Sequence, residues 1–164
     1  QIGNHRVILD SRTLAKMLDA VDVTDSELVL DVGSGYGYSA AIIAHLAEAV
    51  VALESEDKPA NEMQNAFTDH GIDNVIVERG PLFVGAASHA PYDVIFVQGG
   101  IELLPNEILT QLKEGGRIVA IFMQGSLGSV KVGYKLNNAV SWRFAFNAGA
   151  PVLDGFRKEM TFTF

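Results

Sequence analysis

A glycine-rich turn between an apolar run and a helix-like segment constrains the fold of this chain more than any other feature. The run 28–30 leads into Asp31, and glycines then occupy every second position over 33–37. Glycine has no Cβ, so the chain can turn sharply there from a strand into a helix expected over 38–48. The unpaired N–H groups of such a helix N-terminus can face a ligand. The segment therefore predicts a strand, a turn and a helix arranged around a bound molecule.

Strand-like and helix-like segments alternate along most of the chain. The expected helices cover residues 11–21 (with Asp10 or Ser11 as N-cap), 38–48, 58–70 and 105–112. The expected strands cover residues 27–32, 50–53, 75–77, 92–97 and 117–122, then a hairpin of 130–136 and 140–146, and a last strand at 160–164. This order predicts an α/β fold with a three-layer, Rossmann-like sheet that is mostly parallel and has an antiparallel C-terminal edge.

Composition narrows the class of protein. A chain of 164 residues is expected to form a single domain, 1–164, with one core. The net charge of −8 and the lack of a basic stripe disfavour a nucleic-acid partner. No apolar stretch is long enough to span a membrane, and the absence of Cys fits a cytoplasmic protein. The chain starts at Gln1 rather than Met, which suggests a fragment that lacks an N-terminal segment.

An acidic residue follows the second strand at the spacing of a nucleotide-binding βαβ unit. Glu54 ends the apolar run 50–53, where a carboxylate can accept hydrogen bonds from a ribose. The dinucleotide pattern needs a glycine where Tyr38 stands, and no Lys follows the turn as a P-loop requires. A nucleoside without phosphates fits better, and S-adenosylmethionine is one. Asp31 and Glu54 can face its ammonium group, ribose hydroxyls and positive sulfur.

Other residues point to structure rather than chemistry. The four His residues show no ligand spacing, so no metal site is predicted. Three aromatic residues of the second hairpin strand, Trp142, Phe144 and Phe146, alternate with other residues and are expected on one face, with Trp142 in the core.

The sequence resembles the protein-L-isoaspartate O-methyltransferase family of class I S-adenosylmethionine-dependent methyltransferases. The resemblance runs over most of the chain, and the run Tyr-Asp-Val-Ile with Gln-Leu-Lys-x-Gly-Gly-Arg downstream is its most specific mark. The matching segments are 30–41, 51–54, 74–80, 91–95 and 111–117.

The resemblance implies a role for each matching position. The glycine turn would pack against the cofactor, Glu54 would bind the ribose, the segment 78–80 would lie along the adenine, and Gln98 would border the methyl group or the substrate. The candidate cofactor-binding residues are Asp31, Gly33, Ser34, Gly35, Tyr36, Glu54, Glu78, Arg79, Gly80 and Gln98.

Two positions depart from the family pattern. Arg79 stands where the family has an Asp that accepts from the adenine amine, and Arg cannot accept a hydrogen bond. Leu9 stands where the family has an active-site Ser, which leaves Asp10 and Ser11 as substrate-side candidates. The Leu9 departure bears on recognition of the isoaspartyl substrate more than on cofactor binding.

The function expected from these observations is O-methylation of L-isoaspartyl carboxylates in damaged peptides and proteins. Such a carboxylate is already ionised at neutral pH, so no general base is needed. Three alternatives remain open: a non-catalytic cofactor-binding relative, a methyltransferase with another substrate, and a nicotinamide-dependent oxidoreductase, which the glycine spacing disfavours.

Overall fold

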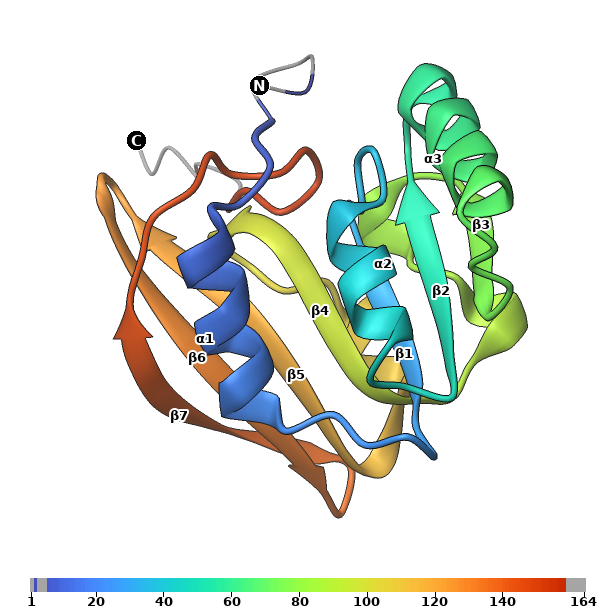
Figure 1. Cartoon of the computed structure of the whole chain (residues 1–164). Coiled ribbons are helices and arrows are strands. Elements are labelled where there is room, and N and C mark those ends of the chain that lie inside the picture. The colour runs from blue at the N-terminus through green and yellow to red at the C-terminus, as the bar shows by residue number, and fades with distance from the viewer. Residues whose placement is uncertain (1, 3–5, 159–164) are drawn as a thin grey trace.

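Apolar strands and amphipathic helices assemble into one seven-stranded sheet with the order β3-β2-β1-β4-β5-β6-β7 (Figure 1). The structure is a computed structural model that describes residues 2 and 6–158. The strands are β1 (Leu28–Val32), β2 (Ala49–Glu54), β3 (Val75–Arg79), β4 (Tyr92–Ile101), β5 (Leu112–Gln124), β6 (Leu127–Leu136) and β7 (Ala139–Asn147). The helices are α1 (Ser11–Val21), α2 (Tyr38–Ala44), α3 (Asp57–Asp69) and α4 (Asn106–Thr110), with short 3-10 turns η1 (Leu82–Val84) and η2 (Ala87–His89).

The predicted fold class is confirmed. β1 lies between β2 and β4 and pairs in parallel with both, while β5, β6 and β7 pair antiparallel. Val29 and Leu30 point to opposite faces of the sheet and both are fully buried, as expected for a central strand. The carboxyl ends of β1, β2 and β4 therefore meet at one edge of the sheet, which is where the glycine turn and Glu54 lie.

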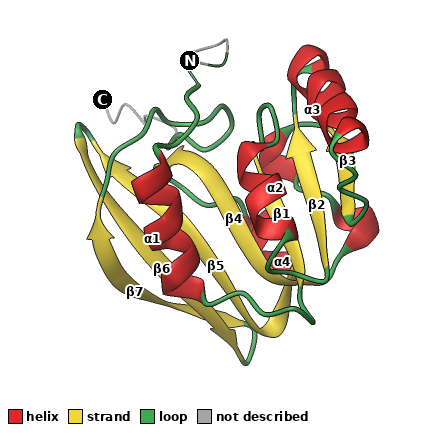
Figure 2. Cartoon of the chain, in the orientation of Figure 1, coloured by secondary structure: helices red, strands yellow, loops and turns green. Residues whose placement is uncertain are grey.

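Helices cover both faces of the sheet and give it three layers. α1, α2 and α3 lie on one face, where Met17, Ile43 and Met63 join its apolar side chains (Figure 1). α4 lies behind the sheet in the view of Figure 2, and Ile108 from α4 packs there in one cluster with Phe156 from the segment after β7. No helix in the described part of the chain is long and apolar enough to cross a membrane.

Several element boundaries differ from the prediction. α2 ends at Ala44 rather than at 48, because the Asn74 side chain donates to the carbonyls of Ala44 (2.8 Å) and Glu48 (3.3 Å) and so replaces the last turn. β5 begins at Leu112, inside the predicted helix, because Tyr92 of β4 pairs with Leu112 and the Gly115-Gly116 turn is absorbed as a strand irregularity. The predicted last strand at 160–164 lies outside the described residues.

The prediction for the aromatic residues of β7 is wrong. The register of β6 and β7 shifts between Val130 and Lys131, so the alternation of side chains along β7 is broken there. Phe146 packs on the α1 side, beneath Lys16 (4.1 Å from nitrogen to ring centre), whereas Trp142 packs edge-on against Phe122 on the other face. Trp142 is also 37% exposed rather than in the core, because β7 is the edge strand of the sheet.

The segment that follows β7 folds back over the end of β4. The Gly100 N–H donates to the Pro151 carbonyl, and the Leu153 N–H donates to the Gly100 carbonyl, both at 2.9 Å. A Cβ at Gly99 would lie 2.5 Å from Leu153, so only glycine admits this close approach. The fold-back places Asp154 beside the carboxyl edge of the sheet.

Candidate nucleoside site

The glycine turn is held in place by the neighbouring strand. Gly33 and Gly35 have positive φ angles of 83° and 58°, which L side chains rarely adopt. The N–H groups of Gly33 and Ser34 both donate to the Leu53 carbonyl on β2, at 2.9 and 3.1 Å. Tyr36 is half-buried within the turn. The predicted turn thus stands at the carboxyl edge of the sheet, directly beside Glu54.

Glu54 presents an ionised carboxylate at this edge. Its side chain is fully buried and accepts N–H groups from Gly35 (2.7 Å), Ser55 (2.8 Å) and Glu56 (3.1 Å). Burial alone would raise its pKa, but hydrogen bonds and the charge of Arg6, with the amides of Glu56 and Gly35, outweigh burial and hold the pKa below the usual glutamate range. A strong acceptor therefore lies where the sequence predicts a ribose carboxylate.

Arg6 forms a buried ion pair with this carboxylate. Its two terminal nitrogens lie 2.5 and 2.9 Å from the two oxygens of Glu54, and one of them also donates to the Gly33 carbonyl at 3.1 Å. Arg6 is only 7% exposed. Arg6 was not predicted as a site residue, because 48 residues separate it from Glu54 and no local pattern links them.

Asp31 lies beneath the turn as the centre of a polar network. Its fully buried carboxylate accepts from Ser34 Oγ (2.7 Å), Ser39 Oγ (2.6 Å) and Gln98 Nε2 (2.7 Å). Burial raises the pKa of Asp31, and the nearby Glu54 charge adds to that shift against the opposing hydrogen bonds. The network fixes Ser34 and Gln98, two of the predicted site residues. Ser39 was not predicted, although its place in the first turn of the helix that follows the glycines is a usable signal.

A cavity of ≈ 350 Å³ opens beside Arg6, the ion-pair partner of Glu54. The side chains of Leu82 and Phe83 give it an apolar wall, and Asp154 of the fold-back segment borders it. The other lining residues are Arg6, Ser55, Glu56, Gly80 and Pro81. Its volume falls within the range usual for small-molecule sites, about 300–1,000 Å³. None of Ser55, Leu82, Phe83 and Asp154 was predicted, since each lies in a loop or turn without a motif.

The three residues predicted along the adenine separate in the structure. Gly80 lines the cavity. The Glu78 carboxylate lies 3.2 Å from His89, and Arg79 donates to Asn61 on α3 at 2.5 Å. Neither Glu78 nor Arg79 is among the residues that line the cavity. The backbone and apolar side chains after β3, rather than these two charged side chains, border the space.

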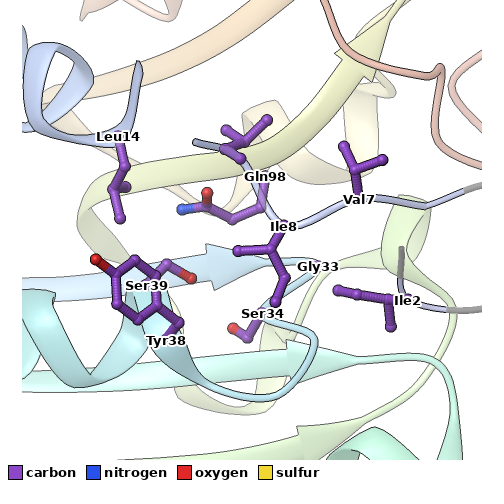
Figure 3. Close-up of a pocket in the computed structure, with 10 residues that line it drawn as sticks. Ile2, Val7, Ile8, Leu14, Gly33, Ser34, Tyr38, Ser39 and Gln98 are labelled. Carbon is purple, nitrogen blue, oxygen red and sulfur yellow. The ribbon is translucent and has the colours of Figure 1, made fainter. Parts of the chain in front are cut away.

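The side of the glycine turn that faces away from the ≈ 350 Å³ cavity is filled by the N-terminal segment. Only ≈ 10 Å³ remains between the turn and the end of β4. Figure 3 shows Val7 and Ile8 of this segment gathered with Ser34 and Gln98 around that space. Leu14 of α1 and Tyr38 of α2 complete the surroundings.

The two substrate-side candidates serve the start of α1. Asp10 is the N-cap and accepts from the Thr13 N–H (2.9 Å) and the Thr13 hydroxyl (2.7 Å), bonds that lower its pKa. Ser11 is the first helical residue and is exposed. Leu9, at the position where the resemblance implies a Ser, is 6% exposed and belongs to the core on the α1 side. The geometry therefore gives Asp10 a capping role.

Solved structures share this fold. A protein-L-isoaspartate O-methyltransferase superposes with a TM-score of 0.81 and 27% identity, over 87% of this chain and 47% of that one. A putative protein-L-isoaspartate O-methyltransferase from Plasmodium falciparum, solved with S-adenosyl-L-homocysteine, gives a TM-score of 0.75 at 18% identity, over 92% of this chain and 80% of that one.

Sequence comparison points to the same group of proteins. Protein-L-isoaspartate O-methyltransferase 2 of Polaromonas sp. (strain JS666 / ATCC BAA-500) is 38% identical over 118 residues, which are 72% of this chain and 56% of the relative. Protein-L-isoaspartate O-methyltransferase 2 of Anaeromyxobacter sp. (strain Fw109-5) is 37% identical over 131 residues, which are 80% of this chain and 53% of the relative. The chain thus spans about half the length of these curated relatives.

The family model described as protein-L-isoaspartate(D-aspartate) O-methyltransferase matches residues 1–142, which include the glycine turn, Glu54 and the end of β4. With the shared fold and the relatives above, this match identifies the chain as a member of the protein-L-isoaspartate(D-aspartate) O-methyltransferase family.

Proposed function

We propose that this chain is a single S-adenosylmethionine-binding methyltransferase domain whose acceptor is the carboxylate of L-isoaspartyl residues in damaged peptides or proteins. The observation that carries the proposal is the buried, ionised Glu54 beside the glycine turn. Family membership supports the acceptor class. A cytoplasmic location, where such repair would act on cellular proteins, is part of the same proposal.

The chemistry of the site fits this cofactor. Ribose hydroxyls are donors, and Glu54 offers a strong acceptor. Gly33 and Gly35 face Arg6 and Ile2 of the N-terminal segment, whereas Gly80 with Leu82 borders the open cavity, which is suited to a flat base. Glu54 is the acidic side chain that would favour a cationic ligand over a phosphate, since Asp31 is fully buried beneath the turn and accepts from Ser34, Ser39 and Gln98.

The protein's task in such a reaction is positioning. S-adenosylmethionine, when bound, supplies an electrophilic methyl group on a positive sulfur. Asp31 holds Ser34 and Gln98 in fixed positions beside the glycine turn. Fixed side chains there suit the alignment of the methyl donor with the acceptor carboxylate and the exclusion of water. An acceptor carboxylate needs no base, so no catalytic His or Asp is assigned.

Two assays test the proposal in sequence. Calorimetric titration of the chain with S-adenosylmethionine is expected to give saturable binding that Glu54→Ala weakens at least about tenfold, as for loss of a charge-assisted hydrogen bond. Transfer of labelled methyl to an isoaspartyl peptide is then expected, with the same peptide carrying ordinary aspartate as control. Absence of binding would refute the cofactor, and equal methylation of both peptides would refute the acceptor.

A non-catalytic cofactor-binding role is the second candidate, and two observations favour it. Leu9 is buried in the core and has no hydroxyl to offer a substrate, and Arg79 is engaged with Asn61. Saturable cofactor binding with no methyl transfer to the isoaspartyl peptide, in a sample of the full-length protein, would support this candidate over the first.

A further inference from the structure

Arg6 stands where the proposed function requires a ribose. Its guanidinium engages both oxygens of Glu54 in a two-pronged ion pair, at 2.5 and 2.9 Å. The remaining acceptor capacity of that carboxylate is used by the N–H groups of Gly35, Ser55 and Glu56. The two hydroxyls of a ribose would need the same oxygens. A nucleoside and the Arg6 side chain therefore compete for one acceptor.

The chain around Arg6 fills the space next to it. Val7 and Ile8 close on Gly33, leaving only ≈ 10 Å³ there (Figure 3). Ile2 packs so tightly on the turn that a Cβ at Gly35 would lie 2.4 Å from its Cδ1. By contrast, the cavity on the far side of Arg6 keeps ≈ 350 Å³. The base end of the site is open, and the rest is occupied by the protein itself.

The ion pair has favourable geometry, but the hydrogen bonding of the Arg6 guanidinium is incomplete. Arg6 and Glu54 are 7% and 0% exposed, so solvent screens their attraction little. Arg6 Nε is buried and finds no hydrogen-bond partner among the described residues. Glu54, in contrast, keeps three N–H donors when Arg6 is removed. The carboxylate can therefore exchange Arg6 for another donor without being left unpaired.

We propose that Arg6 is a built-in competitor for the nucleoside: it holds Glu54 in the free protein and must leave before a ribose binds. The inference rests on the proposed function, since it presumes a nucleoside ligand. The apparent affinity for that ligand is then lower than the intrinsic affinity, because it equals the intrinsic affinity multiplied by the fraction of molecules in which Arg6 has left Glu54. Loss of Arg6 removes this reduction, so the variant binds more tightly than the natural chain.

The experiment is calorimetric titration with S-adenosylhomocysteine of the natural chain and two variants. Arg6→Gln removes the guanidinium that binds both oxygens of Glu54. Arg12→Gln removes the same charge from an exposed position in the first turn of α1 and serves as the control. Arg6→Gln is expected to bind at least about tenfold more tightly than the natural chain. Arg12→Gln is expected to bind as the natural chain does.

Three outcomes would count against the inference, and they separate it from the proposed function. Binding by the natural chain with equal or weaker binding by Arg6→Gln overturns the competitor and leaves the cofactor in place. Absence of binding by all three folded proteins overturns both. If far-UV circular dichroism shows that Arg6→Gln does not fold, Arg6→Lys replaces it. Lys keeps the positive charge but cannot bind both carboxylate oxygens as a guanidinium does. Failure of Arg6→Lys to bind more tightly than the natural chain overturns the proposed role of Arg6.

Discussion

At the scale of single residues, two buried carboxylates within one site are shifted in opposite directions. The pKa of Asp31 is raised by burial, while that of Glu54 is lowered because Arg6 and backbone N–H groups favour its charged form. Asp31 thus organises neighbouring side chains through Ser34, Ser39 and Gln98. Glu54 presents negative charge. The difference comes from the partners of each group rather than from its residue type.

The Glu54 shift predicts a pH dependence of stability. A carboxyl group whose folded pKa is depressed contributes stability above its unfolded pKa, about 4.3, and loses it as the pH falls through the folded value. Glu54→Gln is expected to lower the free energy of unfolding by about 3 kcal/mol at pH 7, because Arg6 is left buried without its partner. The deficit should begin to shrink as the pH falls below the unfolded value of about 4.3, and it should vanish only below the depressed folded pKa, where the natural Glu54 is neutral as well.

Urea unfolding of both proteins between pH 7 and pH 3 measures this difference. Asp31 is present in both, so its opposite shift largely cancels. A deficit that stays constant across the whole range would contradict the assigned shift of Glu54.

At the scale of elements, the three positions of the turn require glycine for different structural reasons. Gly33 and Gly35 face the N-terminal segment and Gly33 borders the filled part of the site. Gly37 is the N-cap residue of α2 with a φ of 87°, and a Cβ there would lie 2.6 Å from Met63 and 2.8 Å from Phe67 on α3. Gly37 therefore allows α3 to pack on the turn, and it serves the fold rather than the ligand.

Gly37→Ala is expected to destabilise the protein by roughly 3 kcal/mol, the sum of backbone strain at positive φ and of crowding against α3. Gly71→Ala is the matched control: its φ is 66°, but nothing lies within 4 Å of the added Cβ. The control should lose only the backbone part, roughly 1–2 kcal/mol. Denaturant unfolding gives both values, and equal losses would refute the packing role of Gly37.

At the scale of the whole molecule, the sequence predicts the sheet better than the site. Runs such as 28–32 and 92–97 are apolar on both faces, so their place in a parallel sheet follows from local composition. Glu54 was predicted because it ends such a run. Arg6 and Asp154 were not, because each reaches the site from a segment without periodicity. Only tertiary packing brings them beside Glu54.

The single-domain expectation for this chain can be tested by two probes of unfolding. Trp142, the one tryptophan, lies on β7 against Phe122, so its fluorescence reports the antiparallel end of the sheet. Far-UV circular dichroism reports all helices and strands. One cooperative domain predicts coincident urea transitions by the two probes. Separate midpoints would mean that the β5–β7 end unfolds independently of the parallel part.

Because the segment after β7 folds back, two segments that are far apart in the sequence border the same cavity. Arg6 and Asp154 border the same cavity, one from ahead of α1 and the other from beyond the last described strand. Shortening the chain from either direction would thus strip a wall from the cavity before it removed any strand. Trimmed forms of this protein would keep the signature of an intact sheet and still bind differently, so folding alone is a poor guide to where the functional unit ends.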